Sequence, residues 1–236
     1  MTQVMAHRGA SKVELENTTL AFAKALQMGA DAVELDVRRC GSGDLVVHHD
    51  PKLSDGQAIF LTDRSKLPSH IPSLAEALDA CGSMWVNIEI KNEPKEPDFD
   101  PQEVTARKVV DFLVQRGSID SWLISSFRRE TVDLIRSLMP QLKTAWLVMT
   151  IDDAHLETVA KEMSRQGHTA LHPWVKQLSR RMVDIFHNFG LQINTWTCDD
   201  PTRMRELVDW QVDGICTNVP DIARQIVDSP SSSFKR

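Results

Sequence analysis

Short segments with the polarity pattern of β-strands alternate along the chain with longer segments that have the pattern of α-helices. Apolar residues recur at every third or fourth position from Leu156 to Met163, which is the spacing of a helix that buries one face. Similar spacing and helix-start signals predict helices in residues 73–78, 106–113, 182–189 and 201–208, and another that begins at Pro220. Regular alternation of strands and helices is typical of a parallel α/β architecture.

Nine segments are predicted to be strands: residues 4–7, 32–37, 45–48, 86–91, 122–125, 144–148, 169–172, 192–196 and 214–217. Only residues 38–44 separate the second segment from the third, whereas a parallel crossover needs about a dozen residues or more. These two segments are therefore expected to form an antiparallel hairpin. The other eight predict a distorted (β/α)₈ TIM barrel with an extra antiparallel hairpin strand after its second strand.

A doubly wound open sheet is the alternative α/β fold, but no glycine-rich phosphate loop follows any predicted strand. We expect residues 1–228 to form a single barrel domain and residues 229–236 to form a disordered tail. Two irregular stretches, residues 51–72 and 92–101, are expected on the C-terminal face of the barrel, where substrate loops lie.

Composition narrows the class of protein. The chain has 236 residues, 42% of them hydrophobic, which is enough for one large α/β domain. Its net charge of −6, without a cluster of basic residues and interleaved aromatics, argues against a nucleic-acid partner. No apolar stretch approaches the roughly 20 residues of a membrane helix, and no signal peptide is evident. We expect a cytoplasmic, soluble protein without stable membrane insertion.

The four cysteines are scattered, with no CxxC pair and no histidine at zinc-site spacing: Cys40, Cys81, Cys198 and Cys216. We expect four reduced thiols rather than disulfides or a zinc site. The oligomeric state stays open, and a homodimer is among the alternatives.

Two predicted strands carry ionisable residues at alternating positions. In the second strand Glu34 and Asp36 share one face, and in the strand of residues 86–91 Glu89 and Lys91 do the same. Burying an ionised carboxylate without a partner costs on the order of several kcal/mol. Such strands usually hold a cation or a catalytic proton.

In a barrel these carboxylates meet at the C-terminal ends of neighbouring strands, where three of them would repel one another unless a cation were bound. Oxygen ligands favour one hard divalent ion, Mg²⁺ or Ca²⁺ with Mn²⁺ as a further alternative, over zinc. The competing interpretation is a structural salt-bridge network of Glu34, Asp36 and Glu89 with Arg8 and Lys91.

Four further side chains at predicted strand ends suit phosphodiester chemistry. Arg8 and Lys91 can hold phosphate oxygens. His7 and His49 can divide the proton transfers, because cleavage needs one group to deprotonate the attacking hydroxyl and another to protonate the departing alkoxide. His48 is expected to point to the other side of its strand and to be structural.

With these residues in view, the sequence resembles glycerophosphodiester phosphodiesterases, and the compact cytosolic members in particular. The resemblance spans essentially the whole chain, and its N-terminal third is the specific part. It lies in an ordered set of motifs: His7-Arg8-Gly9, Glu16-Asn17-Thr18, Gly29-Ala30-Asp31, Glu34-Leu35-Asp36-Val37, Val47-His48-His49-Asp50-Pro51, Glu89-Ile90-Lys91, Ser125-Ser126-Phe127, Asn194-Thr195-Trp196-Thr197 and Val212-Asp213-Gly214-Ile215.

The resemblance implies a barrel of the phospholipase-C-like phosphodiesterase type that hydrolyses glycerophosphodiesters, such as glycerophosphocholine or glycerophosphoethanolamine. The products would be sn-glycerol 3-phosphate and an alcohol, and the reaction would need a divalent cation. By residue, it implies a general base at His7 and an acid at His49, metal ligands at Glu34, Asp36 and Glu89, phosphate contacts at Arg8 and Lys91, and a substrate-bordering aromatic at Trp196. For Trp196, packing at the barrel rim is an equal alternative.

Three positions depart from the family's usual pattern. Leu15 stands where a proline is common, Cys40 where a threonine is frequent, and Asn218 where an aspartate is frequent. They bear on loop geometry and substrate preference. Two other functions stay open: a lysophospholipase D acting at a membrane surface, and a catalytically inactive barrel that serves as a binding module.

Overall fold

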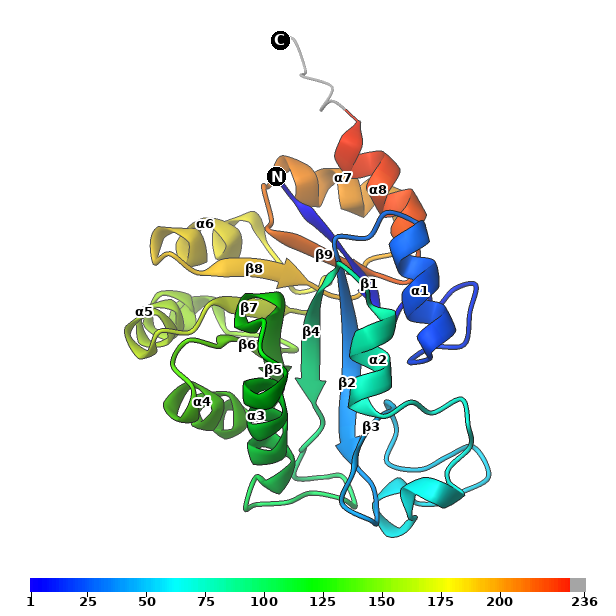
Figure 1. Cartoon of the computed structure of the whole chain (residues 1–236). Coiled ribbons are helices and arrows are strands. Elements are labelled where there is room, and N and C mark those ends of the chain that lie inside the picture. The colour runs from blue at the N-terminus through cyan, green and yellow to red at the C-terminus, as the bar shows by residue number, and fades with distance from the viewer. Residues whose placement is uncertain (230–236) are drawn as a thin grey trace, which may run out of the picture.

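The protein folds into a closed barrel of parallel strands surrounded by helices (Figure 1). The computed structural model describes residues 1–229. The tail predicted at residues 229–236 lies outside the described residues, apart from Ser229. The strands are β1 (Gln3–His7), β2 (Ala32–Arg39), β3 (Leu45–Val47), β4 (Trp85–Ile90), β5 (Trp122–Ser126), β6 (Lys143–Val148), β7 (Ala170–Pro173), β8 (Gln192–Thr195) and β9 (Gly214–Thr217).

The sheet order is β1-β9-β8-β7-β6-β5-β4-β2-β3, and the pairing of β1 with β2 closes the barrel. Within the closed barrel the neighbouring strands are parallel. The predicted (β/α)₈ architecture is therefore confirmed, and the open sheet is wrong. All nine predicted strands are present, with ends that differ by at most two residues.

The hairpin strand lies outside the closed ring. The first part of β2, from Ala32 to Glu34, pairs with β1, whereas Val37 to Arg39 pair antiparallel with β3. β2 therefore extends two residues beyond the predicted end at Val37. This longer strand carries one more residue of the alternating polar row into the structure.

The helices are α1 (Thr19–Gln27), α2 (Leu74–Ala80), α3 (Val104–Arg116), α4 (Arg129–Leu138), α5 (Leu156–Gln166), α6 (Arg180–Asn188), α7 (Pro201–Asp209) and α8 (Pro220–Asp228). The predicted capping box of α2 is present, with Ser73 and Glu76 bonded to each other's backbone. The predicted set omits α1 and α4. In α1 apolar residues lie on both the buried and the exposed side, as Phe22 and Leu20 do, so its sequence has no clear helical stripe.

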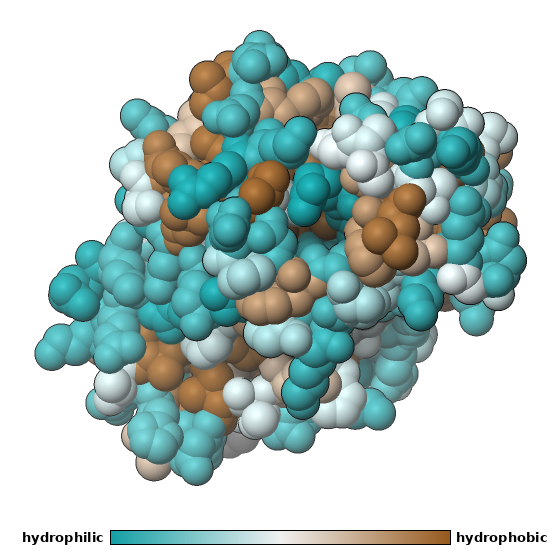
Figure 2. Space-filling view, turned by 90° about the horizontal axis from the view of Figure 1, so that it is seen from below, coloured by the Kyte–Doolittle hydropathy of each residue, from teal (hydrophilic) through white to brown (hydrophobic). Residues whose placement is uncertain are grey.

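Apolar packing occupies three places. Two large clusters lie between the strands and the surrounding helices, and smaller clusters fill the N-terminal part of the barrel interior around Trp85. A further cluster, which includes Val46 and Ile59, lies between β3 and the segment that follows it. The polar side chains of the site therefore lie at the C-terminal ends of the strands. The arrowheads of β2 and β4 point toward the bottom of Figure 1, which is the side seen in Figure 2.

Two expectations from composition can be compared with the structure. All four cysteines are free and buried in the structure. Within residues 1–229, no helix combines the length and the apolarity needed to cross a membrane.

Candidate active site

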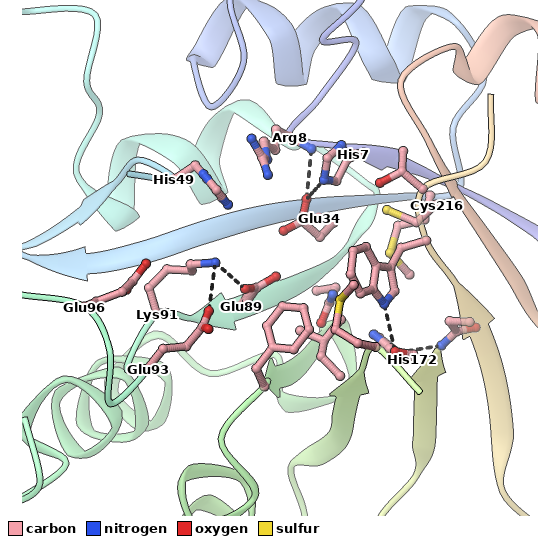
Figure 3. A pocket seen from close by; sticks show the side chains of 18 residues that line it. His7, Arg8, Glu34, His49, Glu89, Lys91, Glu93, Glu96, His172 and Cys216 are labelled. Atoms are coloured by element: carbon pink, nitrogen blue, oxygen red, sulfur yellow. Dashed lines mark hydrogen bonds and ion pairs between the residues drawn. The ribbon is translucent and has the colours of Figure 1, made fainter. Parts of the chain in front are cut away.

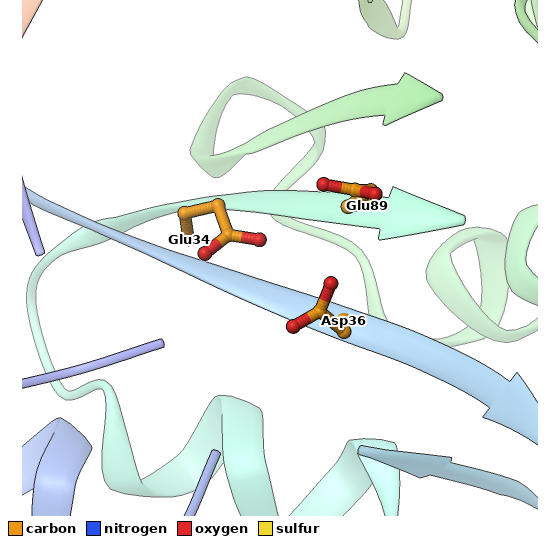
Figure 4. A group of neighbouring side chains, drawn as sticks. All are labelled: Glu34, Asp36 and Glu89. Carbon is orange, nitrogen blue, oxygen red and sulfur yellow. The ribbon is translucent and has the colours of Figure 1, made fainter. Parts of the chain in front are cut away.

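Three carboxylates converge at the C-terminal mouth of the barrel (Figure 4). Glu34 and Asp36 project from the same face of β2, and the parallel register sets Asp36 beside Glu89 of β4. All three side chains are buried, and each offers an oxygen within 4.8 Å of the others. The predicted convergence of these residues is confirmed.

The charges of these carboxylates are poorly balanced. Burial, together with Asp36 and Glu89, raises the pKa of Glu34 well above its usual range. Burial also raises the pKa of Glu89, to about 7. Burial acts in the same direction on Asp36, but Lys91 and Arg8 outweigh it and lower the pKa of Asp36. The two neighbours of Asp36 are therefore held in an environment that disfavours negative charge.

Two carboxylate oxygens in this group lack partners. Among the described residues, Glu34 Oε1 and Asp36 Oδ1 are buried and form no hydrogen bond. Buried oxygens of this kind are costly unless a cation or a donor reaches them. The three carboxylates therefore fit a hard divalent cation, which would remove their mutual repulsion and use the unpartnered oxygens.

Arg8 and Lys91 border the carboxylates. Lys91 Nζ donates to Glu89 Oε1 at 2.8 Å and lies 3.9 Å from Asp36 Oδ1, while Arg8 Nε lies 3.2 Å from Asp36 Oδ2. Salt bridges of the competing interpretation are thus present. They neutralise part of the charge but leave the two oxygens above without hydrogen bonds, so the network and a cation site are compatible.

The backbone at the end of β1 is shaped for this site. Arg8 has a φ of 55° and Gly9 a φ of 84°, and a Cβ on Gly9 would lie 2.6 Å from the backbone of Ala21. Only glycine fits there, which explains the His-Arg-Gly sequence at the strand end. The turn lets the Arg8 N–H donate to Glu34 Oε2 at 3.0 Å and hold that carboxylate in place.

His7 is held by an amide. Its Nδ1 lies 2.7 Å from Asn218 Oδ1, and Asn218 Nδ2 in turn donates to Asp199 Oδ2. Because Asp199 fixes the direction of the amide, the oxygen faces the ring and His7 carries its proton on Nδ1. The Nε2 lone pair is left free 3.9 Å from Glu34. Burial, aided by Arg8, lowers the pKa of His7 and favours this neutral form.

His49 is held by a carboxylate. Its Nδ1 donates to Asp50 Oδ1 at 2.7 Å, so its Nε2 is available to carry a second proton. Burial lowers the pKa of His49, while Asp36 opposes this shift. His48 lies outside the lining of the cavity that His49 borders, and its Nδ1 lies 2.9 Å from the carbonyl of Asp50. Both residues follow β3, which ends at Val47, and they border different cavities.

One cavity of about 310 Å³ connects these groups (Figure 3). His7, Arg8, Glu34, Glu89, Lys91 and His49 line it, as does Trp196. Trp196 Nε1 donates to the carbonyl of His172 at 2.8 Å, and its ring meets Phe127 edge to face with centroids 5.3 Å apart. Trp196 therefore both packs at the rim and borders the cavity. Of the predicted residues, Asp36 lies behind this lining.

Several residues of the site were absent from the predicted set. Asn17 donates to Asp36 Oδ2 at 2.8 Å, Asn218 orients His7, and His172 and Phe127 also line the cavity. Arg38 contacts the backbone of His49. The signal for Arg38 was present in the sequence, because it continues the row of Glu34 and Asp36.

The chain is similar over most of its length to known proteins. The model of the glycerophosphoryl diester phosphodiesterase family matches residues 7–59 and 54–222. A glycerophosphodiester phosphodiesterase of Bacillus altitudinis is 30% identical over 253 aligned residues, covering 96% of this chain and 98% of the relative. One from Bacillus subtilis is 27% identical, covering 94% of this chain and 85% of the relative.

Solved structures give the same result. A phosphodiesterase of Oleispira antarctica, in complex with the product sn-glycerol-3-phosphate, has a TM-score of 0.86 and 26% sequence identity. The match covers 97% of this chain and 98% of that chain. From the family match, the full-length relatives and the shared barrel, we conclude that the chain is an enzyme of the glycerophosphoryl diester phosphodiesterase family.

Proposed function

We propose that the protein hydrolyses small glycerophosphodiesters, such as glycerophosphocholine and glycerophosphoethanolamine, to sn-glycerol 3-phosphate and an alcohol. The observation that supports this most is the pair of imidazoles, His7 and His49, which border one cavity with three buried carboxylates. Full-length relatives named as glycerophosphodiester phosphodiesterases, and a structural relative bound to sn-glycerol-3-phosphate, support the choice of substrate.

Glu34, Asp36 and Glu89 are the residues that would hold one divalent cation, Mg²⁺, Ca²⁺ or Mn²⁺. When bound, such an ion supplies Lewis-acid stabilisation of phosphate charge. The protein's own cations add to this. Arg8 and Lys91 border the same cavity, and each can move from a carboxylate partner to a phosphate oxygen when substrate enters.

The environments of the two histidines support different roles. His7 has a neutral amide partner and a free Nε2 lone pair, so we assign it as the base that deprotonates the glycerol 2-hydroxyl. The resulting oxygen attacks phosphorus. His49 has a carboxylate partner, and an anionic phosphodiester beside it favours the protonated ring. We assign it as the acid that protonates the departing alcohol.

This first step leaves a cyclic glycerol phosphate. Water then attacks phosphorus, with His49 taking the water proton and His7 returning a proton to the 2-hydroxyl. The bond between phosphorus and the 2-oxygen of glycerol breaks, and the product is sn-glycerol 3-phosphate.

A hydrolysis panel tests the proposal. Glycerophosphocholine, glycerophosphoethanolamine and lysophosphatidylcholine would be incubated with the enzyme in Mg²⁺, Ca²⁺ or EDTA, with release of the alcohol and of sn-glycerol 3-phosphate measured. We expect cation-dependent hydrolysis of the two water-soluble diesters. Preference for lysophosphatidylcholine would favour a lysophospholipase D. Substrate binding without turnover under every condition would favour a binding module.

A further inference from the structure

Arg38 is the largest side chain in the described chain that is fully buried. It stands on β2, two residues after Asp36, and its guanidinium lies beneath the loop that follows β4. Nη1 donates to Asp98 Oδ2 at 2.6 Å and Nη2 donates to Glu96 Oε1 at 2.9 Å. Both carboxylates belong to the irregular stretch of residues 92–101.

Arg38 also donates hydrogen bonds to an uncharged acceptor. Nε and Nη2 both donate to the backbone carbonyl oxygen of His49, at 2.8 Å and 2.6 Å. Two carboxylates already balance the buried charge, so charge compensation alone does not require this contact. A planar fork with donors on three nitrogens is what joins one backbone oxygen and two carboxylates at once, and a lysine cannot reproduce it.

His49 is thereby fixed at both ends. Its carbonyl is held by Arg38, and its ring is held by the Nδ1 bond to Asp50 Oδ1 at 2.7 Å. The residue follows β3 on a segment without regular secondary structure, and its side chain is 33% exposed. Figure 3 shows the ring extended toward the cavity, on the side of Lys91 and Glu96. Among residues 1–229, only Arg38 donates a hydrogen bond to the carbonyl oxygen of His49.

We propose that Arg38 is a positioning residue that holds His49 in place to protonate the departing alcohol. This inference rests on the proposed function, in which His49 is the acid. Displacement of a catalytic group by about 1 Å can cost as much as 100-fold in rate, so a backbone anchor can matter as much as the side chain that it supports.

The leaving group distinguishes positioning from a structural role. Departure of choline or ethanolamine as an alkoxide requires a proton, whereas p-nitrophenolate leaves without one. His49 also acts on water after the alcohol has left, so the quantity compared is kcat/KM for release of the alcohol, which reports the first step. Damage to the acid slows this step much more for glycerophosphocholine than for the p-nitrophenyl ester of glycerol phosphate. General loss of folded protein slows both substrates by the same factor.

Arg38→Lys is the main variant, because it keeps the charge and removes the fork. We expect kcat/KM for release of choline from glycerophosphocholine to fall about 10-fold or more, and kcat/KM for release of p-nitrophenol to fall less than about threefold. Arg39→Gln is the matched control on the same strand, since Arg39 is 37% exposed and its Nη2 lies 3.7 Å from Asp100. We expect it to leave both rates and their ratio unchanged.

His49→Ala supplies the reference. It should show the same selective loss, and the Arg38→Lys/His49→Ala double variant should be no slower than His49→Ala alone, since both changes remove one function. If Arg38→Lys slows both substrates equally, the inference is wrong while the role of His49 stands. If His49→Ala itself shows no selectivity, the assignment of His49 as acid is wrong.

A second variant covers the case in which Arg38→Lys lacks a cooperative melting transition. The Glu96→Gln/Asp98→Asn double variant keeps the guanidinium and removes the charges that orient it. We expect its ratio of the two rates to lie between those of the wild type and His49→Ala. A wild-type ratio in this folded variant would overturn the inference.

Discussion

The ring of His7 and the side-chain amide of Asn218 meet 2.7 Å apart, although 211 positions separate them in the chain. The amide also accepts from Ser11 Oγ at 2.8 Å and donates to Asp199 Oδ2 at 2.7 Å. The partner of His7 is thus an amide whose far end is bonded to a carboxylate, which fixes the tautomer of the ring without placing a charge on it.

This arrangement predicts how Asn218 can be replaced. Asn218→Ala leaves His7 free to rotate, and we expect kcat for glycerophosphocholine to fall roughly tenfold or more. Asn218→Asp places two carboxylates at the 2.7 Å contact with Asp199 and should also impair activity. The Asp199→Asn/Asn218→Asp double variant restores the hydrogen bond and should recover most of the loss. Full activity of Asn218→Ala would contradict this role.

The two histidines are expected to be individually necessary. Replacement of His7 or His49 by alanine should each lower turnover of glycerophosphocholine by about 100-fold or more, because a positioned acid or base contributes that much. His48→Ala is the neighbouring control, and it should retain near-normal rates because His48 lies outside the cavity lining. Steady-state kinetics on the three variants checks this prediction, and near-normal rates for His7→Ala or His49→Ala would refute it.

The three carboxylates should bind a cation, and without one their mutual repulsion should destabilise the folded protein. We expect Mg²⁺ or Ca²⁺ to raise the melting temperature of the wild type, because binding to the folded state alone adds stability. Glu34→Gln should abolish this rise. In EDTA the same variant should be more stable than the wild type, by on the order of 1 kcal/mol, because a buried repulsion is removed.

Glu93→Gln is the control for the cation prediction, since Glu93 is 39% exposed and contacts Lys91 rather than the three carboxylates. It should keep the cation-dependent rise. Calorimetric titration with Ca²⁺ or Mg²⁺ gives an independent measure, and undiminished cation binding by Glu34→Gln would exclude Glu34 as a ligand.

His172 should make the folded protein sensitive to acid. Burial lowers its pKa to about 3, whereas an unfolded histidine has a pKa of about 6.5. Below pH 6.5 the unfolded chain therefore binds a proton that the folded protein does not, and the free energy of unfolding falls as pH decreases toward 3. At pH 5 this single group should cost about 2 kcal/mol relative to neutral pH.

Urea unfolding at pH 7 and pH 5 tests the His172 prediction. The loss of stability between these pH values should be about 2 kcal/mol smaller in His172→Asn than in the wild type. His155→Asn changes an exposed histidine and should lose as much stability as the wild type does. Equal losses in all three proteins would show that His172 is protonated in the folded state.

Strand positions were well predicted, but the polar row on β2 was cut short. The alternation of Glu34 and Asp36 could be recognised in the sequence because these charged residues interrupt an apolar run. The predicted strand ended at Val37, so Arg38 was not assigned to the same row. The strand continues because residues 37–39 pair with β3, a contact that depends on the hairpin rather than on local polarity.

Phe127 and His172 illustrate a different limit. Strands of a parallel barrel are covered by helices outside and side chains inside, so their sequences are apolar on both faces. His172 lies in β7, whereas Phe127 follows Ser126, the last residue of β5. Neither residue belongs to an alternating polar row like that of Glu34 and Asp36, so the polarity pattern did not show that they line the cavity. Closure of the barrel brought both side chains to it.

By itself, the sequence determined the strands and most of the helices of this protein, and the sharing of one strand face by Glu34 and Asp36. These features follow from local chemistry, since the backbone of a strand sets the direction of alternate side chains. Tertiary structure decided which groups became partners. Closure of β1 against β2 and β9 brought His7 to Glu34 and Asn218, and burial then set their charges, because desolvation depends on what surrounds a group in space.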